Sequence, residues 1–138
     1  MRDLGVHRGD RRLVAADVWL VERMTDGKER SQLQSVRGVL HRPMAFYFDS
    51  VDTGRDRLDI FGKLAADPAQ GGIAVALETI RARADPGQEG YQSAHWFRST
   101  VRLKPDEVVE ISLPGLGDET RGPADRTLSL RIRAKLIR

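Results

Sequence analysis

The chain has 138 residues, of which 40% are hydrophobic and 31% are charged, and its formal net charge is +3. This length suits one domain with a single core, and this composition excludes an intrinsically disordered chain. Cysteine is absent, which excludes a disulfide framework, a thiol nucleophile and a zinc site built on thiolates.

Residues 1–11 contain no hydrophobic stretch that resembles a signal peptide. We expect them to form a flexible N-terminal segment, followed by a single domain over residues 12–138. No apolar run approaches the roughly 18 residues that a transmembrane helix needs. The chain as written therefore predicts a cytoplasmic protein, or a periplasmic or secreted one if a signal peptide has been removed.

Apolar and polar residues alternate along most of the chain, which is typical of strands with one buried face. The alternation starts in residues 12–24, where the valines also fit a helical stripe, and we expect a strand there. Residues 32–40 and 43–51 predict two more strands. Pro43 separates them and predicts a bend or a sheet edge, because proline donates no ladder hydrogen bond.

The middle of the chain continues the pattern in residues 57–64 and 71–87. The second of these segments competes with a helix, since alanine and glutamate favour helices, but its isoleucine, valine and threonine favour a strand. Arg81 and Arg83 share the parity of its apolar side chains, and we expect both to lie beyond the packed part of the sheet. Between the two segments, residues 66–72 predict one of two longer loops rich in Gly and Pro.

The clearest strands are predicted over residues 91–104 and 126–138, which alternate without interruption. A turn at Lys104–Glu107 and a short strand over residues 108–114 follow the first of them, and we expect the two strands to form a hairpin. Residues 114–125 form the second longer loop. The total of seven or eight strands predicts an all-β fold, a single antiparallel β-sandwich that is immunoglobulin-like or related, with a barrel as the alternative.

Two of these strands carry basic residues and one aromatic ring on the side opposite their apolar face. The residues are Trp96, Arg98, Arg102 and Lys104 on one strand and Arg131, Arg133 and Lys135 on the other. If the strands pair with these faces aligned, they form a positive platform for single-stranded nucleic acid or an anionic glycan. The competing interpretation is a solvated face whose charges prevent aggregation.

Four acidic residues follow closely on one another near the middle of the chain, and Asp49, Asp52 and Asp56 make a candidate calcium site. Their spacing does not match an EF-hand loop, and neighbouring arginines offset their charge, which favours solvated turn acids. His7, His41 and His95 lack the spacing of a local metal site. We therefore expect no metal and no cofactor, and no pattern nominates catalytic residues.

Three functional hypotheses follow. The first is a non-enzymatic binding or assembly domain that acts through contacts with another protein or with its own copies. The second is a carrier in which a barrel encloses a small apolar ligand among Phe46, Phe48, Phe61 and Phe97. The third is a polyanion binder that uses the arginine-rich face, whose affinity would fall steeply with added salt.

Overall fold

The computed structural model describes residues 12–24, 26–51, 57–84, 90, 93–113 and 126–137. Its strands are β1 (Leu13–Met24), β2 (Glu29–Val39), β3 (Met44–Val51), β4 (Arg57–Ala69), β5 (Gly72–Ala84), β6 (Ser93–Leu103), β7 (Val109–Ser112) and β8 (Arg126–Leu136). Every regular element in these ranges is a strand, which confirms the all-β prediction. No helix in the described ranges is long and apolar enough to cross a membrane.

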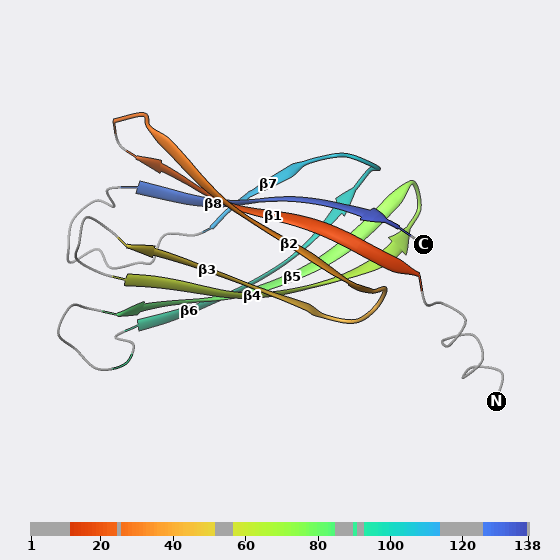
Figure 1. Cartoon of the computed structure of the whole chain (residues 1–138), viewed down its shortest axis with the longest axis horizontal. Helices are drawn as coiled ribbons and strands as arrows, with labels where there is room; N and C mark the ends of the chain where they lie inside the picture. The colour runs from red at the N-terminus through yellow and green to blue at the C-terminus, as the bar shows by residue number, and fades with distance from the viewer. Residues whose placement is uncertain are drawn as a thin grey trace.

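The strands form two antiparallel sheets that pack face to face (Figure 1). Sheet A has the order β2-β1-β8-β7 and sheet B has the order β3-β4-β5-β6. In the described ranges no ladder joins the sheets, so the fold is the predicted sandwich and not the closed barrel. Because sheet B is a simple meander, the sandwich resembles immunoglobulin domains in its layers and not in its strand order.

The chain passes from sheet A to sheet B at the predicted bend before Pro43. His41 adopts a φ of 72° in this turn, and its N–H donates to the carbonyl of Ala66. Beyond the turn, two glutamines of β2 reach the edge of β3. Gln34 Oε1 accepts a hydrogen bond from the Tyr47 N–H at 2.6 Å, and Gln32 Nε2 donates to the Asp49 carbonyl at 2.7 Å. β3 is an edge strand, and these two glutamines form hydrogen bonds with backbone groups that an additional neighbouring strand would otherwise bind.

The predicted hairpin over residues 91–114 is wrong. A turn does form at Lys104–Glu107, where Asp106 has a φ of 64°. However, β6 pairs with β5 in sheet B, whereas β7 pairs with β8 in sheet A. The turn therefore carries the chain between the two layers.

The longer loop predicted over residues 66–72 is also absent, because β4 continues to Ala69 and β5 starts at Gly72. A tight turn joins them, with Gly71 at a φ of 79°. Pro68 is tolerated inside β4 because the pairing with β3 extends only to Leu64, so β4 has no ladder on that side at Pro68. The second predicted loop, residues 114–125, and the N-terminal segment 1–11 lie outside the described residues.

The core lies between the two sheets and is built by alternate residues of their strands. Its most completely buried large side chains include Val14, Val18, Leu20, Leu58, Ile60, Leu64, Val75, Leu103, Leu130 and Ile132. Arg81 of β5 has core parity although it is charged, and it is only 2% exposed. The expectation that Arg81 lies beyond the packed part of the sheet is therefore wrong. Burial lowers the pKa of Arg81 because it penalises the charged form.

Candidate functional site

The outer face of sheet B carries a row of large apolar side chains that crosses all its strands. Tyr47 of β3 pairs with Phe61 of β4, Phe61 pairs with Ile80 of β5, and Ile80 pairs with Trp96 of β6. Their side chains are 45%, 42%, 43% and 61% exposed in that order. The rings of Tyr47 and Phe61 lie 5.1 Å apart and are tilted by 42°. We call these residues the apolar row.

The apolar row is unusual because the outer face of an antiparallel sandwich is normally polar. Strand parity places its members there, since each one alternates with core residues such as Ile60 and Phe46. Large exposed apolar patches on folded domains often coincide with interaction surfaces. The row itself becomes visible only when the register of four strands is known.

A charged row runs parallel to the apolar row and is separated from it by two residues on each strand. It consists of Lys63, Glu78 and Arg98, with Ala45 at the corresponding position of β3. Glu78 forms ion pairs with both cations: its Oε1 lies 3.4 Å from Lys63 Nζ and its Oε2 lies 3.0 Å from Arg98 Nε. Although burial opposes the effect, these hydrogen bonds lower the pKa of Glu78, so its carboxylate stays ionised at neutral pH.

Arg98 also connects the two rows, because its guanidinium lies over the Trp96 ring at 4.0 Å from the ring centroid. Such a cation–π contact keeps a long cationic side chain and an exposed indole in one arrangement. Trp96 and Arg98 therefore project from β6 as one stacked unit.

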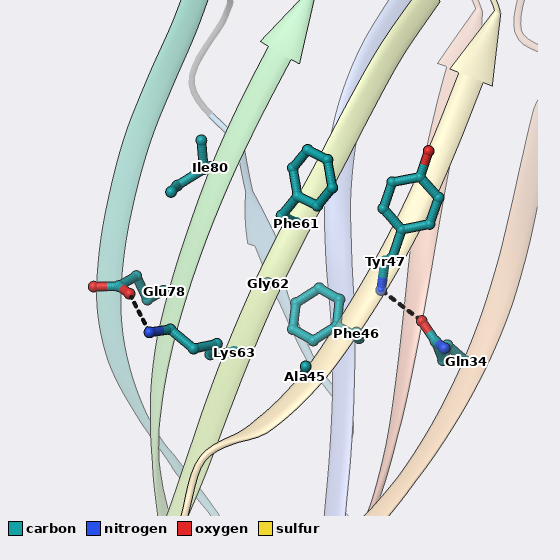
Figure 2. A pocket seen from close by; sticks show the side chains of 9 residues that line it. All are labelled: Gln34, Ala45, Phe46, Tyr47, Phe61, Gly62, Lys63, Glu78 and Ile80. Atoms are coloured by element: carbon teal, nitrogen blue, oxygen red, sulfur yellow. Dashed lines mark hydrogen bonds and ion pairs between the residues drawn. The ribbon is translucent and has the colours of Figure 1, made fainter.

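Two shallow hollows lie on the same face. The first has a volume of about 400 Å³ and is lined by Ala45, Tyr47, Phe61, Lys63 and Ile80, among others. Figure 2 shows Tyr47, Phe61 and Ile80 in line across β3, β4 and β5, with the Lys63–Glu78 pair beside them. The second hollow, of about 520 Å³, lies over Ala65, Ala76 and Thr100. Small side chains produce both hollows, so the face has depressions beside its protruding rings.

On the other side of the apolar row, Asp59 is almost completely buried although its parity points outward. The hydroxyl of Tyr47 donates a hydrogen bond to Asp59 Oδ1 at 2.5 Å. The Tyr47 ring therefore covers this carboxylate and is fixed in position by it.

The residues of the predicted positive platform are divided between the two sheets. Trp96, Arg98 and Arg102 lie on the outer face of β6, with Lys104 just beyond its end, while Arg131, Arg133 and Lys135 lie on β8 in sheet A. The two strands do not pair, so the structure does not bring the two groups together.

The arginines of β8 are engaged by carboxylates. Arg131 and Arg23 both bind Glu29 and Glu110, at 3.1 and 2.8 Å for Arg131 and at 3.2 and 2.7 Å for Arg23. Arg133 binds Asp17 at 2.6 Å. The four residues Arg23, Glu29, Glu110 and Arg131 form a ring of ion pairs that joins all strands of sheet A. The outer face of sheet A is therefore largely charge-paired and less suited to a polyanion than the sequence suggested.

The ring predicts a defined pH dependence. Hydrogen bonds from Arg23 and Arg131 lower the pKa of Glu110 from 4.5 to about 2. The ionised carboxylate thus stabilises the fold above the ordinary pKa, and this contribution is lost as the pH falls from 4.5 towards 2. We expect Glu110→Gln to lower the urea midpoint slightly at pH 6 and to flatten its decrease over this acid window. Urea unfolding at a series of pH values measures both effects, and an unchanged slope would contradict the role of Glu110.

The candidate calcium site is represented only by Asp49, which is exposed, because Asp52 and Asp56 lie outside the described residues. The part of the chain that the structure describes contains no cluster of acidic residues and histidines suited to a metal ion. His41 Nδ1 contacts Asp67 Oδ1, while His7 lies outside the described ranges. The four phenylalanines of the carrier hypothesis do not surround one cavity, since Phe46 and Phe48 are in the core and Phe61 is on the outer face.

Neither the protein-family models, nor the curated proteins, nor the solved structures include a match to this chain. The geometry of the outer face of sheet B is therefore the basis on which a function can be argued.

Proposed function

We propose that the protein is a non-enzymatic binding domain that docks on another protein surface with the outer face of sheet B. The observation that carries this proposal is the apolar row, which crosses all strands of the sheet.

The composition of this face supports a protein partner. Tyrosine, tryptophan, phenylalanine and arginine are enriched in protein interfaces, and all but phenylalanine are also enriched in energetic hot spots. The arrangement also fits, because the apolar row is bordered by the charged row. A central apolar strip with a polar rim is the usual anatomy of such an interface.

A photo-crosslinking amino acid in place of Phe61 tests the proposal in the protein's own host. The matched control places the same amino acid at Leu33, which is exposed on the outer face of sheet A. We expect adducts to a protein from position 61 and few from position 33. Equal yields at the two positions, or no adduct from position 61, would overturn the proposal.

Removal of the indole should weaken the same contact. We expect Trp96→Ala, combined with the crosslinker at position 61, to lower the adduct yield about tenfold, as for a residue of moderate hot-spot energy. Thermal unfolding should change little because Trp96 is exposed. An undiminished yield would show that Trp96 lies outside the contact.

A further inference from the structure

We infer that the surface docked on sheet B is the same face of a second copy of this chain, related by a two-fold axis that runs along the strands between β4 and β5. This inference rests on the proposed function and names its partner. The argument comes from the order of residues across the sheet.

Such an axis reverses the strand order and preserves the height along the strands. It therefore places β4 against β5 of the second copy and β3 against its β6. Within the apolar row, Phe61 then faces Ile80 of the second copy, and Tyr47 faces Trp96 of the second copy. Each contact joins unlike side chains, so an aromatic ring meets either an aliphatic chain or a ring of another size. Interfaces with two-fold symmetry need such self-complementarity.

The charged row is complementary under the same operation. Lys63 faces Glu78 of the second copy, and Glu78 faces Lys63 of the second copy. At the ends of the row, Arg98 faces the small Ala45 of the second copy. Opposite charges therefore meet twice, and no like charges from this row are placed against each other.

The shape of the face agrees with this arrangement. The first hollow, of about 400 Å³, extends from Ala45 and Tyr47 of β3 across β4 to Ile80 of β5. The stacked Trp96 and Arg98 project on the β6 side, where Trp96 is the most exposed member of the apolar row. Reversal of the strand order brings this projection of each copy to the β3 end of the hollow of the other.

The alternative two-fold axis, which runs across the strands along the apolar row, fits less well. It would place each member of the row on itself, with Trp96 against Trp96 and Phe61 against Phe61. It would also set Glu78 against Ala82 of the second copy. Lys63 would meet Asp59 of the second copy, but that carboxylate is buried and already accepts a hydrogen bond from Tyr47. Glu78 and Arg98 would have no charged partner, and Trp96 would not meet the hollow.

The size of the face sets the expected strength. Four strands at about 4.8 Å spacing make a face roughly 20 Å wide, and about 30 Å of strand length gives roughly 1,200 Å² of total contact area. This is the lower limit of specific interfaces, for which we expect a dissociation constant in the micromolar range.

Exchange of the facing charges tests the inference. Lys63→Glu and Glu78→Lys each place like charges opposite one another in their own dimer, and each should weaken dimerisation at least tenfold. An equimolar mixture of the two variants restores opposite charges at both positions of a mixed dimer, and we expect its dissociation constant to return to within about threefold of the wild type. Sedimentation velocity from about 1 μM to about 1 mM measures this. Lys135→Glu, the same change on the outer face of sheet A, serves as control and should dimerise like the wild type.

A second variant uses shape in place of charge. Ala45 is exposed, so Ala45→Trp should fold normally, but its indole would fill the hollow where the stacked Trp96 and Arg98 of the second copy are placed. We expect this variant to be monomeric over the same concentrations. A monomeric wild type, a mixture of charge variants no tighter than its components, or a dimeric Ala45→Trp protein would each overturn the inference.

The crosslinker at position 61 separates this outcome from failure of the proposed function. An adduct with another protein, together with a monomeric wild type, would reject the second copy and retain the docking role. The absence of any adduct would reject both.

Discussion

Replacement of Gly62 with alanine is expected to lower the free energy of unfolding by about 2–3 kcal/mol, as an overpacked core position. Gly62 pairs with Phe46 across β3 and β4, and a Cβ atom on Gly62 would lie 2.0 Å from Cζ of Phe46. The Phe46 ring cannot swing away freely, because it is buried in the core and packs against Phe48 at 5.8 Å between ring centroids. Urea denaturation of the purified variant measures the loss.

A double-mutant cycle identifies the cause. Phe46→Leu replaces the ring with a shorter branched side chain, so the methyl group added at position 62 has space. We expect Gly62→Ala to cost less than about 1 kcal/mol in the Phe46→Leu background, so the two changes should be strongly non-additive. Additive costs would show that the conformational freedom of Gly62, and not the covering ring, explains its presence. Gly71 is a contrasting case, because its φ of 79° and the open space around it make backbone conformation the reason for glycine there.

Two isoleucines on opposite faces of sheet B should respond very differently to truncation. Ile60→Ala is expected to destabilise the fold by about 2–5 kcal/mol, because Ile60 is fully buried between the sheets and its loss leaves a cavity. Ile80→Ala is expected to cost less than about 1 kcal/mol, because that side chain is 43% exposed. Both strands are central in the sheet, so strand position is matched.

Dimerisation should show the opposite order for this pair. Ile80 lies at the centre of the proposed contact, whereas Ile60 faces the core. We therefore expect Ile80→Ala to weaken self-association while folding remains intact. Chemical denaturation measures the free energy of unfolding of both variants, and sedimentation measures their dimer dissociation constants. Equal losses of unfolding free energy in Ile60→Ala and Ile80→Ala would contradict the assigned faces.

The prediction of strands from sequence succeeded because alternation is a local property. The patterns of residues 12–24 and 71–87 each also fit a helix, yet their β-branched residues and their place among other strands favour strands, and the structure has β1 and β5 in these segments. Pairing is not local, and here the prediction was less successful. Nothing within residues 91–114 distinguishes a hairpin from a turn that connects the two sheets. The difference arises because β6 pairs with β5 and β7 pairs with β8, and both of these partner strands lie outside this segment.

The candidate site was only partly accessible for the same reason. Trp96 and Arg98 were identified from one strand, but Tyr47, Phe61 and Ile80 belong to three others and meet only through the register of the sheet. Arg81 shows the limit of parity alone. A charged residue with core parity was assigned to the solvent, whereas the structure buries it within the sandwich.

The strand order has a consequence for how the chain folds during synthesis. Sheet B is a meander of consecutive strands, so all its partners are available once residue 103 has been made. Sheet A has β8 between β1 and β7, and therefore stays incomplete until the last strand emerges. Until then β1 and β2 can cover only part of the core face of sheet B, and the nascent chain exposes apolar surface on both sides of one sheet. This interval is when chaperone binding would be most useful.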